Sequence, residues 1–425
     1  MMNDNCLSTL FVGIDVSSKS NVLCAIDFNS NKLLNLDVPN NDPGCEIIIN
    51  ELISVLVIHN LSHLVIAIES TSFYSTHIAN LLSSNTSLLN FNVLVFCLNP
   101  KTVKAYRNSF VDLDKNDFLD AFVIADFARC GRISSSPWRG SQFLALQRLT
   151  RHRLHLVECL TREKNYILSN IYLKFSELTR LDDDRPFSNI FSNTCSSILT
   201  DFFSLDDIAY ASLDSLVDFI KDKGKNRFDN PLETAKLLQK AARDSYRLDK
   251  VLYEPINVSI ASSFNVIKSL EKEIKEVDKA ISKNILGLYS SQYSSLISIP
   301  GIGPVLASGI LAEIGTISNF SNNDKLAKYA GLTWRETQSG NFSSDNTRMT
   351  KTGNKYLRYY LIEAASSVIR YIPEYHEFYL KKYSEVNNHK HKRALVLTSR
   401  KLVRLIFGLL NKNQIYSNYY IGEIK

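Results

Sequence analysis

The sequence lacks the features that would mark a secreted, membrane-spanning or zinc-stabilised protein. Its seven cysteines are odd in number and none of them forms a CxxC pair, which argues against a disulfide framework or a zinc site. No apolar run reaches the ~18 to 20 residues of a membrane span. Residues 1–5 lack the basic and then apolar pattern of a secretory signal. We therefore expect a protein of a reducing cytosol.

Length and charge indicate a multidomain protein with a basic C-terminal part. A chain of 425 residues is longer than one hydrophobic core usually fills, so two or three domains are expected. The net charge of +6 is unevenly spread, because residues 328–404 hold 15 Lys and Arg against 6 Asp and Glu. This local excess favours a polyanion such as nucleic acid as the partner of the C-terminal part. A solvated basic face without a partner has the same composition.

The first third of the chain has the element pattern of an α/β domain. Apolar, partly β-branched runs of strand length cover residues 10–15, 22–28, 33–38, 64–68 and 91–97. Helical patterns fall near residues 45–57, 73–83, 101–109 and 117–130. Three strands followed by helix, strand, helix, strand and helix is the order of a ribonuclease-H-like fold.

Four acidic residues lie on these predicted elements where a polynucleotide-cutting enzyme would hold two metal ions. Asp15 and Glu69 each end an apolar run, and Asp117 and Asp120 are three residues apart on one face of a predicted helix. Divalent cations such as Mg²⁺ prefer oxygen ligands, and a pair of them bridging a phosphate is a common way to cut nucleic acid. Each acid alone is as readily a helix N-cap or a solvated loop residue, so the prediction depends on the four together.

Residues 142 to about 285 have an all-helical pattern. Isoleucines recur every seven residues, with Ser263, Leu270 and Val277 at the d positions; these are Ile260, Ile267, Ile274 and Ile281. Three heptads predict a coiled-coil arm, which would pack against a second arm or a second protomer. Residues of about 180–250 contain turn signals and a polar stretch, and we interpret them as a small helical insert between two arms.

A Gly-x-Gly turn marks the start of the C-terminal region. Gly301 and Gly303 precede an apolar helix that is expected to end near Ile314. This is the core pattern of a helix-hairpin-helix element, whose backbone N–H groups can hold a DNA phosphate without reading its sequence. A simple tight turn has the same pattern.

Ser339 lies before a glycine in a polar loop, with five basic residues around it. These are Arg335, Arg348, Lys351, Lys355 and Arg358. A serine hydroxyl becomes a nucleophile when a base, a metal or cationic neighbours favour its alkoxide, and cations would also hold the phosphate under attack. No histidine lies near this segment, so a Ser–His triad is not supported. A plain turn residue is the alternative, and Ser343 and Ser344 would compete as nucleophiles.

The chain resembles transposases of the insertion-sequence-110 family, which also contains Piv-type DNA invertases. In the N-terminal part, the matching motifs are Gly13-Ile14-Asp15-Val16-Ser17, Glu69-Ser70-Thr71 with Tyr74, and Lys115-x-Asp-x-x-Asp-Ala121. In the C-terminal part, they are Ile299–Gly303, Ala330-Gly331-Leu332, Gln338-Ser339-Gly340 and Lys351-x-Gly-Asn-Lys-x-Leu-Arg358. The ordered set spans nearly the whole chain. The chain departs from the family's motifs at Ser72 and Asn116, and neither departure removes an acidic ligand or the nucleophile.

With the element pattern, this resemblance implies a domain order and a chemistry. The expected order is a RuvC-like DEDD catalytic domain at residues 1–135, a helical coiled-coil region at 136–290 and a mainly α transposase domain at 291–425. The implied catalytic residues are Asp15, Glu69, Asp117 and Asp120, which would hold Mg²⁺ or Mn²⁺, and Ser339 as the nucleophile. Gly301, Gly303 and the five basic residues would bind nucleic acid.

The resemblance also implies partners and a location. The expected partners are double-stranded donor and target DNA, a structured guide RNA from the element's own non-coding end, and further copies in a homodimer or homotetramer. The expected location is the cytoplasm of a prokaryote, at the nucleoid.

Two other functions fit parts of the sequence. A structure-selective nuclease, such as a Holliday-junction resolvase, would use the four acids with water and no serine. A degenerate element copy would only bind nucleic acid, and the intact acids argue against it. A DEDD exonuclease is disfavoured because Asp15 is followed by Val16 and Ser17 and not by an Asp-x-Glu motif.

Overall fold

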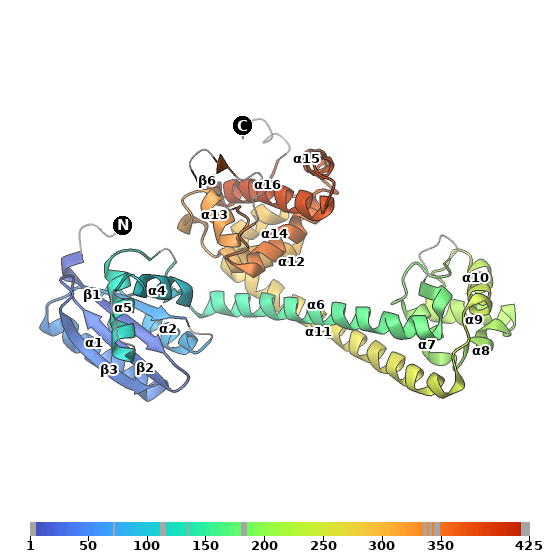
Figure 1. Cartoon of the computed structure of the whole chain (residues 1–425), viewed down its shortest axis with the longest axis horizontal. Coiled ribbons are helices and arrows are strands. Elements are labelled where there is room, and N and C mark those ends of the chain that lie inside the picture. Colours follow the sequence, from blue (N-terminus) through green and yellow to red (C-terminus); the bar gives the residue numbers. More distant parts are fainter. Residues whose placement is uncertain are drawn as a thin grey trace. The chain divides into compact units, whose positions relative to one another are not determined.

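The computed structural model describes residues 6–70, 73–110, 116–133, 136–179, 185–334, 338–339, 342–343 and 349–417 (Figure 1). The chain divides into two compact units. The first unit comprises residues 1–145 and 314–329, and the second comprises residues 146–313 and 330–425. No described helix is both long enough and apolar enough to cross a membrane.

The first unit is built on a five-stranded mixed sheet, and all five strands match predicted ones. They are β1 (Thr9–Val16), β2 (Ser20–Ile26), β3 (Lys32–Pro39), β4 (His63–Glu69) and β5 (Leu94–Leu98), preceded by a 3-10 turn, η1 (Cys6–Ser8). The strand order is β3-β2-β1-β4-β5. β1, β4 and β5 pair in parallel, whereas β2 and β3 join in antiparallel pairing. The carboxyl ends of β1, β4 and β5 therefore meet at one edge of the sheet.

Helices cover both faces of this sheet. On one face α1 (Asp42–Ile58), α2 (Ser75–Ser84) and α3 (Thr86–Leu89) share a core with Leu10, Val12 and Ile14 of β1. On the other face α5 (Asp117–Arg129) packs with α4 (Pro100–Arg107), and its core includes Phe11 of β1. Gly13 lies on the same face as Phe11, because strand residues alternate between faces. A Cβ at Gly13 would collide with the α5 backbone at Ala121 and Ala125, so glycine permits the close approach of α5 to β1.

A long two-helix arm runs through the second unit, as the heptads predicted. α6 (Ser141–Lys174) and α11 (Lys250–Ile297) are antiparallel, and three polar contacts join them along their length. These contacts are Arg153–Asp278, Lys164–Glu271 and Asn170–Ser259. All four predicted heptad isoleucines of α11 are buried.

Short helices lie between the two arm helices in the sequence, where the helical insert was predicted, and their core is shared with residues of both arm helices, such as Ile171 and Ile260. The insert contains the 3-10 turn η2 (Ser176–Thr179), α7 (Asn193–Asp201), α8 (Leu205–Ala209), α9 (Leu213–Gly224) and α10 (Pro231–Asp244). Lys174 is buried at the end of α6, and its Nζ donates to the carbonyls of Leu199 and Phe202 at 2.8 and 2.7 Å. These bonds satisfy carbonyls at the end of α7 that have no partner within the helix.

The remaining elements are six helical segments and one small hairpin among the described residues. They are α12 (Pro304–Ile314), η3 (Ile317–Asn319), α13 (Asn323–Ala330), β6 (Gln338–Ser339), β7 (Phe342–Ser343), α14 (Lys355–Val368), α15 (Pro373–Ser384) and α16 (Lys390–Lys412). Lys351 and Gly353 have positive φ, which an α-helix does not allow, so α14 begins only at Lys355. Asn354 caps it by accepting from Tyr356 N and Leu357 N at 3.0 and 3.1 Å.

A fully buried carboxylate joins three helices of the second unit. Glu313 of α12 accepts two hydrogen bonds from Arg151 of α6, at 2.8 and 2.9 Å, and one from Gln147 at 3.3 Å. It also accepts from Asn354 Nδ2 at 2.7 Å, so it holds the residue that caps α14. The Arg151 guanidinium in turn lies 4.3 Å from the centre of the Tyr356 ring.

Candidate metal centre

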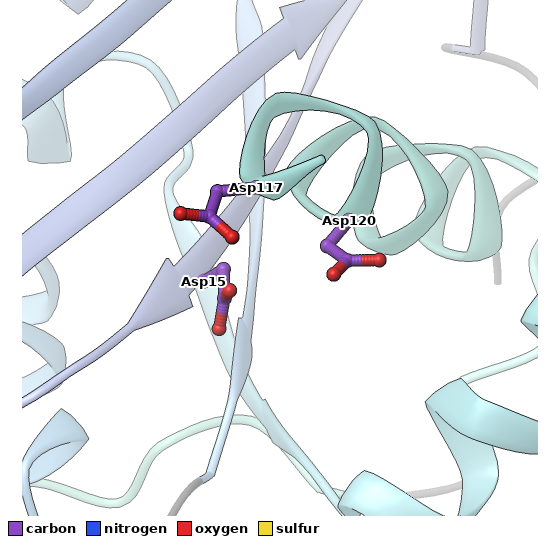
Figure 2. Close-up of side chains that lie close together, drawn as sticks. All are labelled: Asp15, Asp117 and Asp120. Atoms are coloured by element: carbon purple, nitrogen blue, oxygen red, sulfur yellow. The ribbon is translucent and has the colours of Figure 1, made fainter. Parts of the chain in front are cut away.

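Three of the four predicted acids lie together at the carboxyl edge of β1 (Figure 2). Asp15 comes from β1, and Asp117 and Asp120 come from the first turn of α5. Each offers a carboxylate oxygen, and these oxygens lie within 4.8 Å of one another. Two ligands on opposite sides of one Mg²⁺ are about 4.2 Å apart, and about 5 Å apart around Ca²⁺. Adjacent ligands of Mg²⁺ are only about 2.9 Å apart, so the three carboxylates of this acidic cluster would have to draw closer to hold one ion.

The local sequence explains why the two α5 carboxylates face Asp15. Asn116 caps α5, because its Oδ1 accepts a hydrogen bond from Phe118 N at 2.9 Å. The asparagine therefore caps the helix, although this position departs from the family pattern. Carboxylates in the first turn of a helix are favoured by the helix dipole. Gly13, two residues before Asp15, lets α5 approach β1. The end of β1, the Asn116 cap and Gly13 together place the three carboxylates of the acidic cluster side by side.

Glu69 ends β4, the strand beside β1, and the cluster acts on it electrostatically. Partial burial and the nearby charges of Asp15 and Asp120 raise the pKa of Glu69 to about 6, and Arg107 opposes this rise. Burial also raises the pKa of Asp15, with further contributions from Asp120 and Asp117, against a lowering by a backbone hydrogen bond at Val16. Asp15 and the other three carboxylates thus repel each other, and a divalent cation would relieve that repulsion.

Arg107 is a residue of this site that the sequence did not single out. It ends α4 and forms an ion pair with Asp120. The signal for it was present but weak: a basic residue closes the predicted helix 101–109, and only a short segment separates that helix from Asp117. Its guanidinium neutralises part of the negative charge and is suited to phosphate.

Ser339 belongs to the second unit, and the structure describes only its backbone. It pairs with Phe342 in the β6–β7 hairpin. The base of this loop is closed by a bridge between Trp334 and Met349 and by Thr350 N donating to Thr333 O at 2.9 Å. The predicted residues Arg335 and Arg348 lie outside the described residues.

The three other predicted basic residues differ in their surroundings. Lys351 and Lys355 are exposed, and the Lys355 ammonium lies 4.9 Å from the Tyr356 ring centre. Arg358 is partly buried and donates to the carbonyls of Ala330 and Lys351 at 3.0 and 3.2 Å. Burial lowers the pKa of Arg358. Arg358 therefore holds the loop that carries Lys351.

The two glycines of the predicted helix-hairpin-helix turn also differ. Gly301 has φ of +95°, and a Cβ there would lie 3.0 Å from the backbone of Val368 and from the Tyr371 ring. Gly303 is exposed, and a Cβ there would meet nothing within 4 Å. Gly301 is thus required by the turn and its packing, whereas Gly303 leaves the start of α12 open to a ligand.

Comparisons with known proteins agree on one family. Residues 12–175 match a transposase family model of the DEDD type named for IS110, and residues 293–380 match a model described as the IS116/IS110/IS902 transposase family. The chain is 22% identical to the 44.8 kDa protein of insertion element IS116 from Streptomyces clavuligerus, over 75% of this chain and 76% of that protein. It is 27% identical to the IS1111A transposase of Coxiella burnetii, over 46% of this chain and 50% of that protein. It is also 27% identical to the pilin gene-inverting protein of Moraxella bovis, over 44% of this chain and 59% of that protein.

Proposed function

The chain belongs to the IS110 family of transposases, and on that premise we propose that it recombines DNA by metal-assisted attack of a serine. The family makes it an enzyme of a mobile insertion element that acts on DNA. The observation that carries the proposed chemistry is the convergence of Asp15, Asp117 and Asp120, with Glu69 on the adjoining strand. The strand order and the two helical layers support a ribonuclease-H-like, RuvC-like catalytic domain.

The acidic residues would position the scissile phosphate through a divalent cation. Asp15, Asp117, Asp120 and Glu69 supply only oxygen ligands, the donor set that suits Mg²⁺ or Mn²⁺. When bound, such a cation lowers the pKa of an attacking hydroxyl and polarises a phosphate oxygen. Arg107 offsets part of the charge of Asp120, so that the site is not purely repulsive toward DNA.

Ser339 would act as the nucleophile in the proposed exchange. Its Oγ would bond to the phosphorus while the bond from phosphorus to the 3′ oxygen breaks, and the serine proton would pass to that oxygen. A 3′-hydroxyl of the exchange partner would then attack the phosphoserine and release the serine. The number of phosphate ester bonds is conserved, so no ATP is required. Lys351 and Lys355, both exposed, would bind the DNA backbone.

A homodimer or homotetramer is part of this proposal. The acidic cluster lies in the first unit and Ser339 in the second, some 220 residues apart in sequence and on either side of the helical arm. Residues from two protomers could therefore complete one catalytic site. A guide RNA that pairs with donor and target DNA is proposed on the family resemblance.

Covalent trapping tests the mechanism. The protein, the RNA transcribed from its element's flank, Mg²⁺ and labelled DNA are incubated together and separated on a denaturing gel. We expect a protein–DNA adduct that is lost in Ser339→Ala and in Asp15→Asn and retained in the matched control Ser343→Ala. Cut DNA without an adduct, unaffected by Ser339→Ala but lost in Asp15→Asn, would instead identify a hydrolytic nuclease of the resolvase type.

A further inference from the structure

A cavity with a mixed polar and apolar lining lies in the first unit, and none of the acidic-cluster residues lines it. It has a volume of about 350 Å³ and is lined by the starts of β2, α1 and α2. Its lining includes the amides of Asn21 and Asn40, the rings of Phe73 and Tyr74, and His77. No lysine or arginine is among the described residues that line it, whereas the acidic Asp42 is. A cavity of this composition does not suit a phosphate; it suits a flat, uncharged ring with hydrogen-bonding edges.

A buried hydrogen-bond acceptor in the cavity wall has no donor. Asn40 Nδ2 donates to Ser17 O at 2.8 Å, so Asn40 Oδ1 is the atom that faces Asn21. Asn21 Nδ2 donates to that oxygen at 3.3 Å, and this leaves Asn21 Oδ1 without a partner among the described residues. The side chain of Asn21 is only 1% exposed. A buried carbonyl without a donor destabilises a fold, which favours a ligand that supplies an N–H group.

Two neighbouring aromatic rings are exposed at the same cavity. Phe73 is 60% exposed and Tyr74 is 38% exposed, and their ring centres are 4.8 Å apart. Exposed rings of this kind provide a surface on which a nucleobase stacks, whatever its sequence. The acceptor and the rings together thus match a base that carries an amino group.

The cavity is close along the chain to the acidic cluster but on the opposite face of the sheet. Ser18, which lines it, follows Asp15 by three residues, a span of at most about 11 Å. That distance equals about three stacked nucleotides of one strand. Asp15 pairs with Val22, and Asn21 is the next residue of β2, so the side chains of Asp15 and Asn21 lie on opposite faces. A base that leaves the stack near the acidic cluster can reach around this edge.

We propose that this cavity binds an unpaired nucleobase with an exocyclic amine, which donates to Asn21 Oδ1 and stacks on Phe73 and Tyr74. The inference rests on the proposed action on DNA and adds base recognition within a few nucleotides of the acidic cluster. The base could come from the DNA strand at the cluster or from RNA, since the recognised chemistry is the same.

Photocrosslinking with a matched pair of probes tests the proposal. Each probe is a single-stranded thymidine dodecamer with one central 5-iodocytosine or 5-iodouracil, which differ in presenting an amine or a carbonyl at the same position. The full-length protein is irradiated with each probe in EDTA, and crosslinked peptides are identified by mass spectrometry. We expect crosslinks at Phe73 or Tyr74, about tenfold stronger for iodocytosine, in line with one buried hydrogen bond.

Three variants separate base recognition from structure. Asn21→Leu should abolish the preference for iodocytosine. Because it also removes the hydrogen bond to Asn40 Oδ1, the persistence of iodouracil crosslinks at Phe73 or Tyr74 in this variant shows that the cavity is still folded. Phe73→Ala, an exposed position, should reduce both crosslinks at least tenfold. Phe28→Ala removes a ring outside the cavity that is 36% exposed, close to the 38% of Tyr74, and should change neither crosslink.

The outcomes also separate this inference from the proposed recombination. Crosslinks confined to the basic C-terminal helices, or crosslinks at Phe73 that show no preference for iodocytosine, would overturn it. Ribonucleotide versions of the probes show whether DNA or RNA supplies the base. With either sugar, crosslinks that depend on Phe73 and a preference for iodocytosine that depends on Asn21 support base binding in the cavity. Because no strand is cut in EDTA, Ser339→Ala should crosslink normally, whether or not the serine mechanism holds.

Discussion

At the scale of single residues, the acidic cluster is a set of like charges brought together by the fold. Asp15, Asp117 and Asp120 each place a carboxylate oxygen within 4.8 Å of the others, and Glu69 experiences the charges of Asp15 and Asp120. Only Arg107 is a described cation paired with one of them. Without a divalent cation, the site therefore opposes folding at neutral pH, and a cation that binds it stabilises the folded state.

This electrostatic conflict predicts a pH dependence of stability. The pKa of Glu69 is raised to about 6 in the folded protein. Its unfolded pKa is lower, so the folded state binds its proton more tightly. The stabilisation is fully present below the unfolded pKa and is lost as the pH rises through about 6. In EDTA, the melting temperature should therefore rise when the pH falls from 7.5 to 5.5.

The matched variant is Glu69→Gln, whose melting temperature should rise less than that of the wild type over this pH range. Differential scanning calorimetry at several pH values measures the melting temperatures of both proteins. Adding Mn²⁺ at pH 7.5 should stabilise the wild type more than the variant. Equal pH profiles for the two proteins would show that Glu69 is not coupled to the cluster.

At the scale of elements, the buried Glu313 connects the arm to the start of α14. It accepts from Arg151 of α6 and from Asn354, which caps α14. Asn354 stands directly before Lys355, one of the residues proposed to bind DNA. The arm helix and the segment proposed to bind nucleic acid are thus joined through one carboxylate.

Removal of this carboxylate should destabilise the second unit. Glu313→Ala leaves Arg151 and Asn354 without their buried acceptor, and we expect a loss of about 3 kcal/mol in the free energy of unfolding. Glu313→Gln keeps the shape and one acceptor oxygen and should lose less. Urea denaturation measures both. Glu276→Ala, which removes an exposed partner of Lys279 on α11, is the control and should have little effect.

Much of the element pattern followed from the sequence because it depends on local periodicity. The five strands, the heptad isoleucines of α11 and the insert were all predicted, and each arises from the spacing of apolar residues. Arg107 and Asn21 were not predicted as site residues. Arg107 reaches Asp120 only through the packing of α4 on α5, and Asn21 is one polar residue at the edge of an apolar run. The role of Arg107 and the proposed role of Asn21 depend on tertiary contacts. The periodicity of apolar residues in the sequence does not reveal such contacts.

At the scale of the whole molecule, charge is divided along the chain. The acidic cluster lies in the first unit, whereas residues 328–404 hold 15 basic residues against 6 acidic ones. Basic residues that contact phosphates release counterions, so nucleic-acid binding through them weakens as salt rises. The two exposed lysines and the partly buried Arg358 should contribute differently to this dependence.

Salt titration of DNA binding separates these contributions. Lys355→Ala should reduce the slope of log K against log salt by about 1, because it removes one phosphate contact. Arg358→Ala should lower the melting temperature, because it removes the donor that holds the Ala330 and Lys351 carbonyls. Fluorescence anisotropy and thermal unfolding measure the two effects. An unchanged slope in Lys355→Ala would exclude it from the phosphate contacts.

The insert between the arm helices packs against both of them, and two hydrogen bonds also join its two ends. Glu177 N donates to Ser245 Oγ at 3.1 Å, and Tyr246 N donates to Ser176 Oγ at 3.3 Å. The chain therefore leaves the arm and returns to it at neighbouring points, held by two reciprocal bonds. Because the core of the insert also contains Ile171 of α6 and Ile260 and Phe264 of α11, the insert and the adjoining ends of the arm helices stabilise each other. A fusion or exchange that keeps the arm helices paired must therefore spare this shared core.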